Sequence, residues 1–299
     1  MRLSVMVLGF VCLCAVVIGI AAPVQDEDVR GAFLTTRPKD KPATLGPATK
    51  PNRRSPKKPV TPSKPPVNDP NSGHSGSSTT TSSRSSRPVN AQRLGLGLTL
   101  FMRDSNGLAV RVDPDRVFRK GDRVRVLLET NTDGYLYIFN TTDDGAPVMV
   151  YPDADLDEAG NYLQAHVPFE VPLSDAPEER LRWFAFDENA GTEHLFFVFT
   201  REPLNGIPIE DQLIALCKEA QGRCPVKPAT EVWAVVQKEM QEPLKTDKTA
   251  RYGRAQTETE QQASTRGLGL AKNDPEPSMV LMASSARPTL VATLDLIHK

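Results

Sequence analysis

Two Asp-Gly pairs between residues 122 and 151 constrain the fold of this chain more than any other feature of its sequence. Apolar and polar residues alternate over 122–130, ahead of Asp133-Gly134, and β-prone residues follow each pair, which is typical of half-buried strands. Asp-Gly is a frequent centre of the type I′ turn that joins two antiparallel strands. The sequence therefore predicts a three-stranded meander that turns at Asp133-Gly134 and at Asp144-Gly145.

The two predicted turns select one strand register. Counting outward from the first turn pairs Thr130 with Tyr137 and Leu128 with Phe139. Counting outward from the second turn pairs Phe139 with Val150. The apolar faces of the three strands coincide in this register, whereas a slip of one residue would turn the aromatic side chains to the other face.

Further stretches have strand character, and the last of them is apolar on both faces, which is typical of a central strand. They are residues 96–103, 107–113, 166–172, 182–187 and 194–200, with a tight turn at Asn106-Gly107. About eight short strands separated by polar turns are typical of an antiparallel β-sandwich or open barrel. We therefore expect a mainly β domain over residues 93–204.

After the predicted strands the spacing of apolar residues changes to that of helices. Residues 207–221 and 230–240 have apolar side chains at helical intervals, and helices this short need tertiary packing to be stable. We expect both, within a helical extension over 205–243, to pack on the β domain. The remaining tail, 244–299, is mostly polar. It contains two strand-like apolar runs, residues 278–284 and 289–297.

The N-terminal residues have the pattern of an export signal. An almost unbroken apolar run from Leu3 to Ala22 follows Arg2 and ends in small residues, so we expect a signal peptide over 1–21. The run is also long enough to span a bilayer, and an uncleaved anchor through residues 3–22 is the alternative. In either case the protein is expected outside the cytoplasm, periplasmic or secreted if cleaved and anchored in the cytoplasmic membrane if not.

A basic segment over 22–92 follows the signal. Between Val29 and Gln92 it has 12 Lys and Arg against two Asp, with many prolines and a Ser-rich end. A segment of this composition buries too little apolar surface to fold, so we expect a disordered linker. Its simplest role is a flexible stalk. Binding of anionic cell-wall polymer or lipid head groups is the alternative, and nucleic acid is not expected as a partner of an exported segment.

An acidic loop resembles part of a calcium site. Asp153, Asp155 and Asp157 stand at alternate positions, as they would in a helix-loop-helix calcium loop. However, Glu158 occupies the position of the turn glycine, and Gln164 occupies the position of the bidentate glutamate. We therefore expect a solvated loop and no metal, and keep the three aspartates as weak calcium candidates.

The sequence contains no recognisable set of catalytic residues. Its four histidines are scattered, and no nucleophile-elbow serine or phosphate-binding glycine loop accompanies them. We therefore expect no enzymatic activity, no catalytic residue and no cofactor. Cys217 and Cys224 are the only cysteines after the signal, and an oxidising compartment favours a disulfide between them. Two unpaired thiols are the alternative.

Several short motifs follow one another in a fixed order along the predicted strands. They are Phe118, Gly121-Asp122, the GYLY stretch 134–137, Tyr151-Pro152, Gly191, Glu193 and the EPL stretch 202–204. In this order they resemble the bacterial domain of unknown function family 4384 over roughly residues 93–204, although Tyr151 stands where Phe is more usual. Members of that family often accompany caspase-like peptidases, kinases or repeat scaffolds as accessory domains. The resemblance implies no catalytic residues, because none is assigned to the family.

These observations lead to two hypotheses for the function. The first is an exported, non-enzymatic binding or scaffold module, displayed on a flexible stalk at the bacterial cell envelope, whose partner is an unidentified protein or cell-wall polymer. The second is a regulatory or accessory subunit of a separately encoded envelope enzyme such as a peptidase. The exposure of three aromatic side chains bears on how a partner could bind: they would form a contact patch if exposed and would belong to the core if buried. They are Tyr135, Tyr137 and Trp183.

Overall fold

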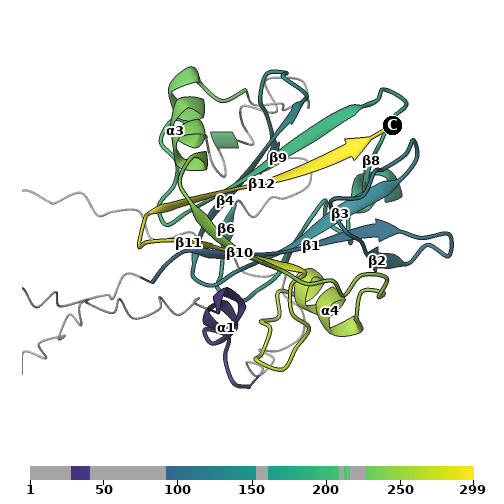
Figure 1. The fold of residues 1–299 in the computed structure, drawn as a ribbon, viewed down its shortest axis with the longest axis horizontal. Helices are drawn as coiled ribbons and strands as arrows, with labels where there is room; N and C mark the ends of the chain where they lie inside the picture. Colours follow the sequence, from purple (N-terminus) through teal and green to yellow (C-terminus); the bar gives the residue numbers. More distant parts are fainter. Residues whose placement is uncertain (1–27, 41–91, 153–160, 209–211, 214, 216–226) are drawn as a thin grey trace, which may run out of the picture.

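The structure is a computed structural model that describes residues 28–40, 92–152, 161–208, 212–213, 215 and 227–299. In these residues two antiparallel β-sheets pack against each other as a β-sandwich and do not close into a barrel (Figure 1). The predicted mainly β class is therefore confirmed. A few short helices cover the outer faces of the sheets.

Each sheet combines strands from distant parts of the sequence. Sheet A contains β1 (Gly95–Arg103), β2 (Ala109–Arg111), β3 (Arg123–Thr130), β7 (Phe169–Val171), β8 (Phe184–Ala185), β10 (Leu244–Lys248) and β11 (Met279–Ala283). Its order is β10-β11-β1-β3-β7, with β2 paired to β1 and β8 paired to β3. Sheet B contains β4 (Gly134–Thr142), β5 (Val148–Tyr151), β6 (Tyr162–Leu163), β9 (Gly191–Thr200) and β12 (Thr289–His298). Its order is β12-β9-β4-β5, with β6 paired to β4.

The core lies between the two sheets and follows the two-residue period of the strands. Val124, Val126 and Leu128 of β3 face this core, as the alternation over 122–130 predicts. Leu136 and Ile138 of β4 face it from sheet B. β9 lies between β12 and β4, so its predicted central position is confirmed.

The predicted hairpin at Asp133-Gly134 is wrong. β3 belongs to sheet A and β4 to sheet B, so residues 131–133 cross from one sheet to the other. The side chains that favoured a local turn bond to distant segments instead. Asn131 Oδ1 accepts a hydrogen bond from Gly95 N at 2.7 Å, and Asp133 Oδ1 accepts one from Ala165 N at 2.8 Å. These contacts hold the chain in the crossing.

The second predicted turn exists, but the register around it differs by one residue. β4 and β5 pair with Phe139 opposite Met149 instead of Val150, and the pairing contains a bulge. The turn is centred on Asp143-Asp144, where Asp143 has a φ of 49°, and not on Asp144-Gly145. As a result, Phe139 and Met149 lie together on the outer face of sheet B and not in the inter-sheet core.

Two local predictions are confirmed. The turn at Asn106-Gly107 joins β1 to β2, with Gly107 at a φ of 81°. The predicted helix over 230–240 is α3 (Thr230–Met240), whose Val232 and Val236 are buried against the outer face of sheet B. Most of the other predicted helix, 207–221, lies outside the described residues.

The C-terminal tail contributes to both sheets. β11 pairs with β1, and β12 pairs with β9 along its whole length from Thr289 to His298. Between them, α4 (Glu258–Arg266) begins at a capping box formed by Thr257 and Glu260 and lies under sheet A (Figure 1). The sandwich therefore extends beyond residues 93–204 and needs both apolar runs of the tail.

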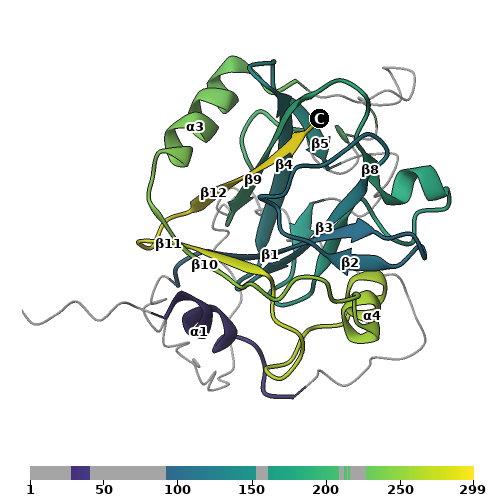
Figure 2. The same ribbon diagram turned by 45° about the vertical axis from the view of Figure 1, so that its right-hand side comes forward.

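Part of the expected linker is folded. α1 (Val29–Leu34) packs on the outer face of sheet A, where Phe33 is fully buried against β11 (Figure 2). Asp28 caps this helix through a hydrogen bond from Gly31 N at 2.8 Å. The prediction of a continuous disordered linker over 22–92 is therefore wrong for residues 28–40, where a capped helix docks on sheet A through the buried ring of Phe33.

A buried ion pair fixes the residues after α1 to sheet A. Arg37, whose side chain is fully buried, donates from Nε and Nη2 to the two carboxylate oxygens of Glu129 at 2.8 and 2.7 Å. His166 Nδ1 lies 2.7 Å from Glu129 Oε1, and His166 Nε2 lies 2.8 Å from Thr36 Oγ1. This network joins the N-terminal segment, β3 and the loop before β7.

Glu129 makes the stability of the fold depend on pH. Burial raises its pKa, but hydrogen bonds and charges from His166 and Arg37 outweigh burial, so the pKa lies below the ordinary value of 4.5. A carboxyl group whose pKa is lowered in the folded state stabilises the fold above its unfolded pKa, and that contribution disappears as the pH falls through the folded pKa.

We therefore expect the difference in unfolding free energy between the parent and Glu129→Gln to narrow below about pH 4.5. Urea unfolding of both proteins, repeated from neutral pH down to the onset of acid unfolding, measures this difference. A difference that stays constant as the pH falls would contradict the expectation.

Several predicted features lie outside the described residues. They are the signal segment 1–21, the linker residues 41–91, the candidate calcium ligands Asp153, Asp155 and Asp157, and the cysteines Cys217 and Cys224. Among the residues that the structure does describe, none of the helices has the length and apolar character needed to cross a membrane.

Candidate functional site

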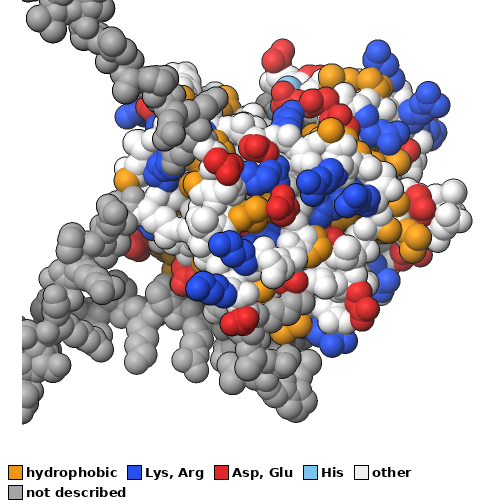
Figure 3. All heavy atoms as spheres, turned by 60° about the horizontal axis from the view of Figure 1, so that its bottom comes forward, with side chains coloured by type: hydrophobic (Ala, Val, Ile, Leu, Met, Phe, Trp, Pro, Cys, Tyr) orange, Lys and Arg blue, Asp and Glu red, His pale blue; other side chains and the backbone are white. Residues whose placement is uncertain are grey.

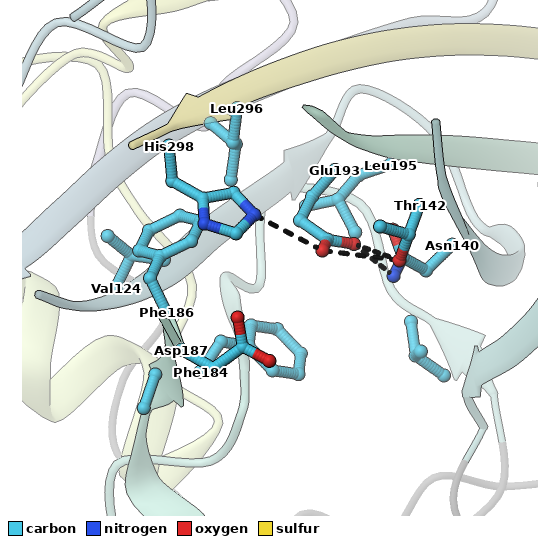
Figure 4. Close-up of a pocket in the computed structure, with 12 residues that line it drawn as sticks. Val124, Asn140, Thr142, Phe184, Phe186, Asp187, Glu193, Leu195, Leu296 and His298 are labelled. Carbon is cyan, nitrogen blue, oxygen red and sulfur yellow. Dashed lines mark hydrogen bonds and ion pairs between the residues drawn. The ribbon is translucent and has the colours of Figure 1, made fainter. Parts of the chain in front are cut away.

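A pocket of about 270 Å³ opens at one end of the sandwich, between the two sheets (Figure 4). Sheet B supplies its polar side through β4, β9 and β12, and the chain around β8 supplies the opposite wall. The base is apolar and is formed by Val124, Leu195 and Leu296. The pocket thus combines an apolar floor with a polar mouth, which is typical of small-ligand sites.

The polar residues occupy inward positions of strands that are otherwise apolar on that face. On β9, Leu195, Phe197 and Phe199 point into the core, and Glu193 continues the same two-residue period. His298 continues the inward row of β12 in the same way. The inner face of sheet B therefore changes from apolar to polar at this end, where a packed core would need more apolar side chains.

Glu193 is held by its neighbours on β4. Asn140 Nδ2 donates to Glu193 Oε2 at 2.7 Å, and Thr142 Oγ1 donates to the same oxygen at 3.0 Å. The strand register explains these contacts, because Thr142 stands opposite Glu193 in the β4–β9 pairing. The carboxylate is thus fixed in position while still reaching the pocket (Figure 4).

Two buried polar atoms in the pocket have no hydrogen-bond partner. His298 is 4% exposed, and its Nε2 lies 3.6 Å from Glu193 Oε1, beyond hydrogen-bond distance. Asn140 Oδ1 is the second such atom. Figure 4 shows His298 Nε2 and the Glu193 carboxylate directed toward each other. Buried polar atoms without partners are uncommon, so they mark a place where a ligand can supply hydrogen bonds.

The opposite wall is aromatic and ends in a carboxylate. Phe186 stacks on Phe118 at 4.8 Å between ring centroids and lies 5.1 Å from the His298 ring. Asp187 follows Phe186 at the exposed rim. Hydrogen bonds from the backbone and the side chain of Asn189 lower the pKa of Asp187, so this carboxylate stays ionised.

The pocket is acidic. Its described lining includes the carboxylates of Glu193 and Asp187 and contains neither lysine nor arginine. The basic residue that comes near the rim, Lys120, pairs with Glu188 at 2.6 Å. The electrostatic field at the mouth therefore favours positively charged groups.

The aromatic residues proposed as a contact patch are buried. Tyr135 and Tyr137 lie on the outer face of sheet B in the cluster that α3 covers, and Leu204 N donates to the Tyr137 hydroxyl at 3.0 Å. Trp183 lies against the outer face of sheet A, with the Arg125 guanidinium 4.3 Å from its ring centroid. All three belong to the core, which is the alternative that the sequence also allowed.

The other predicted site residues are not brought into the pocket. The candidate calcium ligands and the two cysteines fall outside the described residues. Within the described part of the chain, no group of three or more His, Cys, Asp or Glu could hold a metal ion. Sequence reasoning missed Asn140, Glu193 and His298 as a site, and the signal that could have found them is their polar character at inward strand positions.

Comparison with known protein families supports the resemblance found in the sequence. The family model of the domain of unknown function DUF4384 matches residues 117–203. This segment contains the pocket residues from Val124 to Leu195, while Leu296 and His298 lie beyond it. Comparisons with curated proteins and with solved structures found no match.

Proposed function

We propose that this protein is an exported, non-enzymatic binding module of the bacterial cell envelope, and that its partner binds in the pocket between the sheets. The observation that supports this most directly is the pair of buried polar atoms without partners, Asn140 Oδ1 and His298 Nε2, above an apolar floor. A built pocket of this kind suits recognition of one small group or one side chain.

The arrangement around His298 favours binding over catalysis. A hydrolytic site would need a hydroxyl or thiol aligned with the imidazole. The hydroxyl in the lining, that of Thr142, donates to Glu193 instead. Glu193 in turn is occupied in orienting β4 side chains. The expected absence of enzymatic activity and of a cofactor stays a prediction that assays must test.

The proposed location at the envelope depends on the export signal over residues 1–21, with membrane anchoring through 3–22 as its alternative. We do not propose that the expected linker over 22–92 acts as a stalk. Residues 41–91 connect α1 to β1, and both of these elements lie on sheet A, so this segment starts and ends on the folded domain.

To bind an anionic cell-wall polymer, the protein would need an extended basic surface. On the face that carries α1 and α4, basic and acidic side chains are interspersed among the described residues (Figure 3). A protein or a small cationic compound therefore fits the acidic pocket better than an anionic polymer does.

A capture experiment with a blocked pocket tests the proposal. Thr142 is exposed and stands beside Glu193 on the pocket side of β4, so Thr142→Trp should close the mouth without altering the core. The chain from Ala22 onward, tagged at its N-terminus because His298 lies in the pocket, serves as bait in envelope extract. We expect the parent to retain an envelope component that Thr142→Trp loses.

Ala190→Trp is the matched control, because Ala190 is also exposed but does not line the pocket. It should capture the same component as the parent. Equal capture by the parent and by Thr142→Trp would contradict the proposal. If the captured component is an envelope enzyme whose activity changes on binding, the alternative role as a regulatory or accessory subunit is favoured.

A further inference from the structure

We infer that the pocket binds a primary ammonium group carried on an apolar stem, as in a primary alkylamine. This inference rests on the proposed binding function of the same pocket and gives its ligand a chemical class. It follows from the number and type of polar atoms at the mouth, from the charge of the lining and from the size of the apolar base.

The polar atoms at the mouth match the three N–H donors of an ammonium group. Glu193 supplies a carboxylate oxygen, and Asn140 Oδ1 is a buried acceptor without a partner. Because Asn140 Nδ2 donates to Glu193, the amide orientation is set by the hydrogen-bond network and leaves Oδ1 free. In the tautomer with its proton on Nδ1, His298 offers Nε2 as the third acceptor.

The charge of the lining selects among ligands that could donate to these atoms. Glu193 and Asp187 are carboxylates, and the described lining has no lysine or arginine to offset them. An anion would be repelled at the mouth, and a neutral alcohol has one donor for three acceptors. A cation supplies the donors and also compensates the charge of Glu193, which is only a quarter exposed.

The size of the pocket limits the ligand to one group on a short stem. About 270 Å³ lies just below the range of roughly 300 to 1,000 Å³ for sites of drug-sized ligands. Val124, Leu195 and Leu296 form the floor, and the aromatic ring of Phe184 stands at one side. Because the stem is buried against these side chains, each added methylene should tighten binding about three- to four-fold until the floor is reached.

Titration calorimetry on the full chain tests the inference with ligands of matched length. Pentylamine, pentanol and pentanoate differ only in the end group, and butylamine and propylamine vary the stem. We expect pentylamine to bind at least ten-fold more tightly than pentanol, pentanoate not to bind, and affinity to rise from propylamine to pentylamine. Nα-acetyl-lysine amide and 1,5-diaminopentane should bind at least ten-fold more weakly than pentylamine, because the apolar floor would have to bury the polar far end of their stems.

Two variants link binding to the pocket. Glu193→Gln keeps an oxygen that can accept from Asn140 and Thr142 but removes the charge, so pentylamine affinity should fall at least ten-fold while pentanol affinity changes little. Asp187 lies at the exposed rim, so Asp187→Asn removes one partly screened charge. This variant should lower the affinity for pentylamine about two- to three-fold. Thermal melting confirms that both variants are folded.

Asp295→Asn is the control for total charge. Asp295 lies on β12 like His298, but its side chain pairs with His194 on the outer face, at 2.8 Å. Its replacement should leave pentylamine affinity unchanged. Equal affinities for pentylamine and pentanol, or an equal loss in Glu193→Gln and Asp295→Asn, would overturn the inference.

The capture experiment separates this inference from the proposed function. If no amine binds but Thr142→Trp still abolishes capture, the ammonium class is wrong and the binding function stands. If Thr142→Trp captures the same component as the parent does, the pocket is not the binding site, and both the proposed function and the ammonium class fail.

Discussion

Replacing Arg37 with methionine is expected to lower the free energy of unfolding by about 3 to 5 kcal/mol, because Glu129 would keep a buried charge without its main partner. Arg37 also donates to the backbone oxygens of Ala271, Asp274 and Pro275, at 3.3, 3.0 and 2.9 Å, and these would lose a charged donor. Urea unfolding of the full chain at neutral pH, followed by circular dichroism, measures the change.

Lys120→Met is the control for this prediction. Lys120 pairs with Glu188, but both side chains are mostly exposed, so the unfolding midpoint should stay at the parent value. Equal unfolding midpoints for the parent and Arg37→Met would mean that residues 28–40 do not dock on sheet A as described.

Replacing Gly134 with alanine is expected to lower the free energy of unfolding by about 1 to 3 kcal/mol, the usual cost of forcing an extra methyl group into a packed core. A Cβ at this position would stand 2.7 Å from the Phe199 ring and 2.4 Å from the backbone oxygen of Thr200. Neither can move easily, because β9 is held between β4 and β12. The cause is close approach of two strands, since Gly134 is not among the residues with positive φ.

Gly191→Ala provides the comparison. Gly191 also lies in sheet B, but its added Cβ would meet the end of the Asp143 side chain at 3.2 Å, and a carboxylate can shift by that much at small cost. Thermal melting should show a clearly lower melting temperature for Gly134→Ala and a nearly unchanged one for Gly191→Ala. Equal losses would indicate that the backbone contact with Thr200 is not the cause.

Most of the strands could be predicted from local pattern, but β6, β10 and the pairing partners of the strands could not. Alternation over 122–130 places Val124 and Leu128 correctly in the core, and the apolar character of both faces places β9 correctly at the centre. Asp133-Gly134 failed as a hairpin because a crossing between sheets needs the same small, polar residues as a tight turn. The choice depends on distant partners such as Gly95, which local sequence does not reveal.

Composition alone could not predict that part of the N-terminal segment docks on the domain. Residues 28–40 lie in a stretch rich in Pro, Lys and Arg, and the average character of that stretch is disordered. Residues 28–40 are nevertheless folded, because the side chains of Phe33 and Arg37 are buried against sheet A. Glu129 likewise gives no hint in the sequence that it is paired.

The candidate site could be predicted only in part. Glu193 lies within the motifs that resemble the family and on a predicted strand, so its importance was accessible. His298 comes from β12, which closes the sheet next to β9, and the sequence predicts a strand there without predicting its neighbour. The pocket depends on that pairing, so its residues could not be grouped before the topology was known.

The docking of α1 determines how the molecule would be oriented if the export segment remains in the membrane. Residues 23–27 would then be the entire tether between the bilayer and the folded domain, and they can span at most about 18 Å. The face with α1 would therefore lie next to the lipid surface. The C-terminal end of β12, where the pocket opens, lies at the other end of the sandwich in both views (Figures 1 and 2). The pocket would then open away from the membrane, toward ligands that approach from the outer side.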